Sequence, residues 1–337
     1  MSRLKRILRA TLGLLLGGAL VVGLSEVYVR LADPYGVSNF RNQKRYQQEL
    51  MVLDLESPRL FRHRKSANLE LYGFEMATDS LGLRGPERAI PKPEGVRRLF
   101  VLGDSVALGW GVRDEDTFVR LSESLLADQT GQEWECINGG HLFHDTIQEA
   151  EVLREVGFAY EPDIVALVFV DNDLALSSNL LSAGPVEVTP QMQAAADRAR
   201  TWARVQPYFP GVHSLGQFLL GRASKADQIG TVEQAEAVGM DMEKAWQAVQ
   251  AALIQIASDC AERNLRFCIL DYYHQEPLEE FVLEQGWPYA SIAFTDEETA
   301  SGVRLSVADA HANPRGHRYL ADHMLESLVD LGLVEGR

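Results

Sequence analysis

The chain has 337 residues, of which 46% are hydrophobic, and its formal net charge is -16 at pH 7. This length and apolar content argue against a disordered chain and suggest one large domain or two small ones. The excess of acidic residues argues against a nucleic-acid-binding protein, because such surfaces need clustered Lys and Arg to displace counterions from phosphates.

The N-terminus is basic up to Arg9, and an uncharged, mostly apolar run follows from Ala10 to Ser25. A spanning helix needs roughly 17 to 25 apolar residues, and further apolar residues extend this run to residue 31. Because no small-x-small cleavage site follows, the pattern favours a membrane anchor at 10–31 over a cleaved signal peptide or a buried helix. The basic residues predict that residues 1–9 are cytoplasmic and that the domain following the helix is periplasmic or extracellular.

Residues 32–96 mix polar and aromatic residues with turn signals, which predicts a lead-in segment that wraps around the main domain. A regular pattern begins at residue 97. The apolar run 99–103 predicts a buried strand, and residues 116–129 have helical spacing. A second strand is expected at 134–138, followed by a helix that opens with a capping box of Asp145 and Gln148.

A third strand is predicted at 164–170, where nearly every residue is β-branched or apolar, as in a strand covered on both faces. Residues 177–240 break the rhythm and predict an inserted lid or substrate-facing subdomain. A long helix (241–263), a strand (265–271), a weaker strand (289–294) and a final helix from about Gly316 complete the pattern. This alternation predicts an α/β fold, a three-layer α/β/α sandwich with a mainly parallel central sheet.

Polar residues follow the first three predicted strands, where a parallel sheet binds its ligands. Ser105 follows the first strand, residues 138–145 the second, and Asn172 the third. A serine hydroxyl becomes a good nucleophile when a histidine, oriented by a carboxylate, takes its proton, and Asp309 and His311 supply such a pair late in the chain. Taken separately, Ser105 and Asn172 are as well explained as turn residues.

Four short stretches together resemble the four sequence blocks of the SGNH, or GDSL-type, serine hydrolase family. They are "LGDS" at 102–105, "INGG" at 137–140, "DND" at 171–173 and "DAHANPRGH" at 309–317. The flanking "DSLGLRGPE" and "GWGV" resemble the membrane-anchored bacterial branch of that family. The resemblance covers about residues 75–330, except the insertion, and implies a flavodoxin-like SGNH hydrolase domain at 97–337.

The resemblance implies a role for each matching residue. Ser105 would be the nucleophile and His311 the general base, with Asp309 orienting the imidazole. Asn172 would donate its side-chain amide to the oxyanion beside the backbone N–H of Ser105, and the second block would add a donor from Gly140 or Phe143.

Three departures from the family pattern bear on these roles. The acid is commonly three residues before the histidine, but Asp309 stands two residues before His311. Phe143 stands where the second block usually ends in glycine, and phenylalanine resists the positive φ that glycine accepts. The loop is therefore expected to turn differently, with Gly140 or His141 donating, or to form a weaker oxyanion hole. Asp171, where glycine is common, adds negative charge.

Other candidate residues have ordinary interpretations. His141 and His144 either face the pocket or are ordinary surface loop histidines, and the sequence leaves both open. A metal site formed by them with Asp145 is weakly supported by loop spacing alone. His317 fits the N-terminus of the last helix better than a base. Three cysteines lack metal-ligand spacing and are expected to be buried small apolar residues: Cys136, Cys260 and Cys268.

The sequence as a whole predicts a membrane-anchored esterase without metal or cofactor. It would hydrolyse a carboxylic ester of an acylated small molecule, lipid or glycan through an acyl-serine. Two alternatives stay open: a polysaccharide O-acyltransferase with the same site, and a catalytically degenerate binding protein of an exopolysaccharide assembly system.

Overall fold

The computed structural model describes residues 3–33, 36–54, 56–175, 211–212, 214–216, 242–306 and 309–335. The chain forms two compact units, one of residues 1–44 with 185–228 and the other of residues 45–184 with 229–337. Most of the predicted 177–240 insertion lies outside the described residues.

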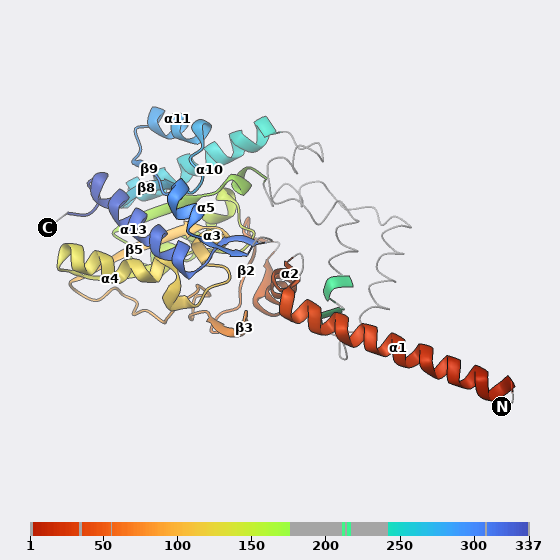
Figure 1. Ribbon diagram of the computed structural model, residues 1–337. Coiled ribbons are helices and arrows are strands. Elements are labelled where there is room, and N and C mark those ends of the chain that lie inside the picture. Colours follow the sequence, from red (N-terminus) through yellow and green to blue (C-terminus); the bar gives the residue numbers. More distant parts are fainter. Residues whose placement is uncertain are drawn as a thin grey trace. The chain divides into compact units, whose positions relative to one another are not determined.

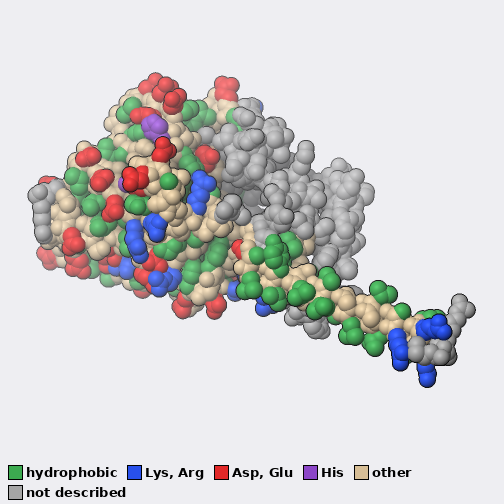
Figure 2. Space-filling model, in the orientation of Figure 1, with side chains coloured by type: hydrophobic (Ala, Val, Ile, Leu, Met, Phe, Trp, Pro, Cys, Tyr) green, Lys and Arg blue, Asp and Glu red, His purple; other side chains and the backbone are tan. Residues whose placement is uncertain are grey.

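The first unit contains helix α1 (Arg3–Ala32) and most of helix α2 (Val37–Arg45). The segment Lys5–Ala32 is long and apolar enough to cross a membrane, by length and composition. Figure 2 shows apolar side chains along α1 and basic side chains at its N-terminal end. The carboxylate of Glu26 is nearly buried and accepts the backbone N–H groups of Gly211 and Val212 at 2.9 and 2.7 Å.

The second unit is built on a five-stranded sheet in the order β6-β5-β7-β8-β9, with every neighbouring pair parallel. Its strands are β5 (Val96–Gly103), β6 (Glu133–Asn138), β7 (Ile164–Phe169), β8 (Arg266–Asp271) and β9 (Tyr289–Ser291). This is the 2-1-3-4-5 order of flavodoxin-like folds, in which the strand order reverses between the first and third strands. The predicted fold class is confirmed.

Helices cover both faces of this sheet because the strand residues are apolar on both sides. In β5, Leu99 and Val101 belong to the core on one face, and Phe100 and Leu102 to the core on the other. The first face is covered by α4 (Phe118–Thr130) and α13 (Pro314–Asp330), and the second by α5 (Thr146–Glu155), α10 (Met242–Glu262) and α11 (Glu276–Glu284). Figure 1 shows this three-layer arrangement.

Capping side chains determine where α5 and α13 begin. The capping box of Asp145 and Gln148 is present at the start of α5, as predicted. The last helix begins earlier than Gly316, because the Asn313 side chain accepts the N–H groups of Arg315 and Gly316 and Pro314 starts the first turn. The two short helices α11 and α12 (Asp296–Ala300) were not predicted. All three cysteines are buried, as expected.

Residues 45–96 lie in the same unit as the sheet. They form a π-helical turn, η2 (Tyr46–Leu50), and two antiparallel hairpins. The hairpins pair β1 (Met51–Asp54) with β2 (Leu60–His63) and β3 (Asn68–Leu71) with β4 (Phe74–Ala77). Their apolar residues pack against Leu108, Trp110 and Leu142, so this segment covers the loop that follows β6.

Candidate active site

Ser105 lies at a sharp turn between the end of β5 and the short helix α3 (Ser105–Leu108). Gly103 makes the turn with φ of +151°, and an added Cβ there would lie 2.7 Å from Cβ of Ala107. Asp104 then caps α3, because its carboxylate accepts the N–H of Val106 at 2.8 Å. The turn therefore puts the Ser105 hydroxyl at the carboxyl edge of the sheet.

A hairpin of β10 (Arg304–Ser306) and β11 (Asp309–Ala312) carries the other two triad candidates. Nδ1 of His311 lies 2.6 Å from Oδ1 of Asp309, and Nε2 lies 2.9 Å from Oγ of Ser105. Because a carboxylate only accepts, the Nδ1–H donates to Asp309, and Nε2 of the neutral ring can accept the proton of Ser105. The shorter Asp-x-His spacing thus still allows a continuous hydrogen-bonded chain, because both residues lie on the same side of a strand.

Tyr72 extends the hydrogen-bonded chain of Ser105, His311 and Asp309, and the sequence did not reveal this contact. Its hydroxyl donates to Oδ2 of Asp309 at 3.3 Å, from the turn between β3 and β4. The two residues are 237 positions apart, so no local pattern links them. Both oxygens of Asp309 therefore have hydrogen-bond donors, which fixes the plane of the carboxylate relative to the imidazole.

Removing this hydroxyl should have a modest effect. Tyr72→Phe is expected to lower kcat/KM for ester hydrolysis by about 5-fold, because a hydrogen bond as long as 3.3 Å contributes only about 1 kcal/mol. Tyr289→Phe is the matched control, since Tyr289 also donates to an aspartate, Oδ2 of Asp271 at 3.0 Å. Equal losses of kcat/KM in the two variants would contradict a specific contribution from Tyr72.

Asn172 lies in the 3-10 turn η5 (Asp171–Ala175), which follows β7. Its Nδ2 donates to Oδ2 of Asp104 at 2.8 Å, and the Ser105 hydroxyl lies 3.2 Å from the same oxygen. The structure therefore brings Asn172 and Ser105 to one carboxylate at the point where the strand order reverses. The Asn172 Oδ1 is buried and has no hydrogen-bond partner among the described residues.

The second-block loop adopts the glycine-like conformation despite its phenylalanine. Phe143 has φ of +73°, which excludes a loop that turns differently, one of the two alternatives that the sequence left open. Gly140 does not fit the role of oxyanion donor, because its N–H donates to Oδ1 of Asn138 at 3.0 Å. Its glycine is needed for packing instead, since an added Cβ would lie 2.1 Å from the backbone nitrogen of Leu108. The N–H of His141 donates to the carbonyl of Gly103 at 3.1 Å.

The loop histidines are buried, which excludes the surface position, one of the two alternatives that the sequence left open. His141 and His144 have 0% and 2% of their surface exposed, and their rings stack with centroids 4.4 Å apart. Burial lowers the pKa of both rings well below the usual value. His317 is also buried, and its Nδ1 accepts the N–H of Phe118 at 3.2 Å, so it is not placed as a base. The described part of the chain contains no group of three or more His, Cys, Asp or Glu side chains arranged for a metal ion.

Two fully buried carboxyl groups accompany Asp104 and Asn172. Neither carboxylate oxygen of Glu149 has a hydrogen-bond partner among the described residues, and Oδ2 of Asp173 accepts the N–H of Val170 at 3.1 Å. Burial, with added repulsion from neighbouring aspartates such as Asp104, raises the pKa of both carboxyls well above the usual range. Burial also raises the pKa of Asp171. These shifts favour protonated carboxyls, which reduces the negative charge that opposes an oxyanion.

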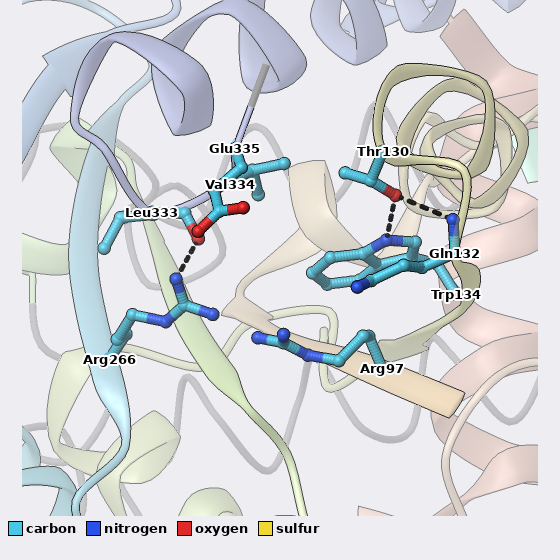
Figure 3. Close-up of a pocket in the computed structure, with 8 residues that line it drawn as sticks. All are labelled: Arg97, Thr130, Gln132, Trp134, Arg266, Leu333, Val334 and Glu335. Carbon is cyan, nitrogen blue, oxygen red and sulfur yellow. Dashed lines mark hydrogen bonds between the residues drawn. The ribbon is translucent and has the colours of Figure 1, made fainter. Parts of the chain in front are cut away.

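A separate hollow of about 280 Å³ opens at the other end of the sheet (Figure 3). Its lining consists of Arg97, Thr130, Gln132, Trp134, Arg266, Leu333, Val334 and Glu335. The guanidinium of Arg97 lies 5.4 Å from the Trp134 ring centroid, and Nη1 of Arg266 donates to the Leu333 carbonyl at 2.5 Å. Arg97 opens β5 whereas Ser105 follows its end, so this hollow is distinct from the candidate active site.

No protein-family model and no curated protein matches the sequence. Among solved structures, a catalytic mutant of Axe2, an acetylxylan esterase from Geobacillus stearothermophilus, is 14% identical, with 69% of this chain and 94% of that chain covered and a TM-score of 0.40. The psychrotrophic esterase EstA from Pseudoalteromonas sp. is 12% identical, with 69% and 97% covered and a TM-score of 0.42. A lipolytic protein of the G-D-S-L family from Desulfitobacterium hafniense is 10% identical, with 68% and 99% covered and a TM-score of 0.38. At these identities and TM-scores, the likeness shows nothing about the chemistry of this chain.

Proposed function

We propose that this chain is a membrane-anchored esterase of SGNH type that hydrolyses carboxylic esters through an acyl-serine. One observation carries the proposal: the hydrogen-bonded chain from Ser105 Oγ through the His311 imidazole to Asp309, with heavy-atom distances of 2.9 and 2.6 Å. In this arrangement a base within hydrogen-bond reach of a serine is itself oriented by a carboxylate.

The reaction would proceed in two steps of acyl transfer. Ser105 Oγ attacks the ester carbonyl while His311 Nε2 takes the hydroxyl proton, and the imidazolium then protonates the leaving alcohol. Water attacks the acyl-serine with His311 again acting as base, and the carboxylic acid leaves. The side chain of His311 is 22% exposed and that of Asp309 is 5% exposed, so the base has access to water while the acid that orients it does not.

The oxyanion would be stabilised by the Nδ2–H₂ group of Asn172 and the backbone N–H groups of Ser105 and Phe143. Nδ2 has two hydrogens and gives one to Asp104, so the second is available for the oxyanion. The left-handed backbone at Phe143 supports the same role for this position as for the glycine of the family pattern.

Loss of this side-chain donor should slow the chemical step. Asn172→Ala is expected to lower kcat by about 10²- to 10³-fold with little change in KM, because an oxyanion donor acts mainly in the transition state. Steady-state kinetics with p-nitrophenyl acetate would measure the effect, and the thermal unfolding temperature of the variant should stay close to that of the wild type. A change confined to KM would contradict this role.

The apolar helix α1 supports the membrane part of the proposal. Its length and composition suit a membrane span, and its basic N-terminal end favours a cytoplasmic start with the esterase unit periplasmic or extracellular. A cleaved signal sequence would give the same pattern of residues. Retention of α1 in the mature protein, tested by N-terminal sequencing of membrane fractions, would distinguish the two.

A fluorophosphonate probe tests the nucleophile directly, because it reacts only with an activated serine. The full chain, purified in detergent, is expected to be labelled at Ser105, as identified by peptide mass spectrometry. A folded chain that is not labelled would favour the degenerate binding protein. If labelling occurs, p-nitrophenyl acetate turnover with and without oligosaccharide acceptors separates hydrolysis, which yields free acetate, from acyl transfer, which yields an acetylated acceptor.

A further inference from the structure

The left-handed backbone at Phe143 has to be held in place by its surroundings. Phenylalanine at φ of +73° places Cβ close to backbone atoms, which disfavours this conformation relative to the right-handed regions. The flanking N–H groups are all bonded: that of His141 to the Gly103 carbonyl, that of Leu142 to the Tyr46 hydroxyl, and that of His144 to the His141 carbonyl. The Tyr46 contact is the one made by a side chain from outside the loop.

The hydrogen positions around Tyr46 follow from its neighbours. His63 Nδ1 lies 3.0 Å from the carbonyl of Gly82, so this nitrogen carries the hydrogen. Burial lowers the pKa of His63 to about 3, so the ring is neutral and its Nε2 is an acceptor. The Tyr46 hydroxyl, 2.5 Å from that Nε2, therefore donates to His63. Its oxygen lone pair is left to accept the N–H of Leu142 at 3.3 Å.

His63, the partner of Tyr46, also contacts the loop through a stack of histidine rings. The His63 ring stacks on His141 with centroids 4.0 Å apart, and His141 stacks on His144. His141 Nδ1 donates to the carbonyl of Gly139 at 3.0 Å, and its Nε2 accepts from Nη2 of Arg59, also at 3.0 Å. Arg59 in turn pairs with Glu155 at 3.2 Å. All three rings are nearly or fully buried, so they form a rigid support.

We propose that Tyr46, held by His63, is a positioning residue that keeps Phe143 in its left-handed conformation and so aims the Phe143 N–H at the oxyanion. The inference rests on the proposed esterase function and deepens it, because it makes the lead-in segment part of the catalytic apparatus. Tyr46 and His63 act through the loop and do not touch the reacting atoms.

The test compares Tyr46→Phe with Tyr160→Phe in the full chain. Tyr160 is the matched control, because it is also a buried tyrosine whose hydroxyl bonds a buried side chain, and that side chain, Asp79, is not part of the loop. Tyr46→Phe is expected to lower kcat for p-nitrophenyl acetate about 10-fold with KM nearly unchanged, and Tyr160→Phe to leave kcat within about 2-fold. An equal loss of kcat in both variants would mean general destabilisation and would overturn the inference.

A background carrying Phe143→Gly supplies the decisive comparison, because glycine adopts positive φ without help. In that background the addition of Tyr46→Phe is expected to change kcat by less than about 2-fold. The 10-fold effect in the native background corresponds to about 1.4 kcal/mol of coupling between the two positions. An undiminished effect of Tyr46→Phe in the glycine background would overturn the inference.

Hydrogen exchange separates this inference from the proposed function, since it needs no turnover. The Leu142 amide is expected to exchange faster in Tyr46→Phe than in the wild type or in Tyr160→Phe. If the wild type neither reacts with fluorophosphonate nor hydrolyses esters, the esterase proposal fails. Faster exchange of the Leu142 amide in Tyr46→Phe would still show that Tyr46 stabilises the loop. Unchanged exchange of that amide in Tyr46→Phe would overturn the inference even in an active enzyme.

Discussion

Ser105→Ala is expected to abolish fluorophosphonate labelling and to lower kcat for ester hydrolysis by about 10⁴- to 10⁶-fold. The alanine removes the hydroxyl oxygen that lies 2.9 Å from His311 Nε2, and loss of a nucleophile that works with its base as a unit has effects of this size. Residual activity would come from the oxyanion donors acting on attack by water. Single-turnover kinetics and intact-protein mass spectrometry would measure both effects.

The control for this change is Ser124→Ala, which alters an exposed serine of α4 whose hydroxyl bonds the carbonyl of Leu121. That variant should keep the wild-type kcat and labelling. His311→Ala should resemble Ser105→Ala, and the double variant should be little worse than either, because the two residues serve the same step. If the fold-losses of kcat in the two single variants multiplied in the double variant, a shared proton transfer would be contradicted.

Acid is expected to lower the free energy of unfolding as the pH falls below about 6.5. Four buried histidines have lowered pKa values, about 3 for His63 and His317 and well below the usual value for His141 and His144, and burial is the main cause of each shift. In the unfolded chain these rings titrate near pH 6.5. Their contribution to stability is therefore complete above about pH 6.5 and is lost as the pH falls toward 3, by up to about 1.4 kcal/mol per pH unit for each ring.

The buried carboxyls of Glu149 and Asp173 act in the opposite direction. Because their pKa values are raised, the folded state binds more protons than the unfolded state above about pH 4.5. Lowering the pH therefore reduces the destabilisation that these buried carboxyls cause. Glu149→Gln removes one of these opposing groups. It should raise the melting temperature at pH 7.5 and steepen the loss of stability between pH 6.5 and 5, measured by thermal scans in detergent. A melting temperature in that variant that does not change with pH would contradict the role of the histidines.

Much of the second unit followed from local sequence patterns. The apolar runs that became β5, β7 and β8 alternate between two cores, and a strand with no polar face has to be covered on both sides. Given a parallel sheet, the residues after these strands meet at one edge, so Ser105 and Asn172 could be placed together before their contacts were known. The cap at Asp145 needed only two residues three positions apart.

Features that depend on distant contacts could not be predicted in this way. No local pattern around His141 and His144 marks them as buried, and their rings contact His63 and Phe61, which are about 80 positions away in the chain. Phe143 adopts a conformation that its own residue type disfavours, because tertiary contacts outweigh a local cost of about 1 to 2 kcal/mol. Tyr72 and Asp309 are hydrogen-bonded although they are 237 positions apart in the sequence, and no local pattern around either residue predicts the contact.

The bond between Ser105 and His311 joins residues 206 positions apart in the chain. During synthesis Ser105 is therefore made long before His311, the base that the proposed function assigns to it. Under that function the serine of a nascent chain stays unreactive until β11 has been made and has paired with β10 next to α3. The order of the residues along the chain would thus delay hydrolytic activity until nearly the last helix.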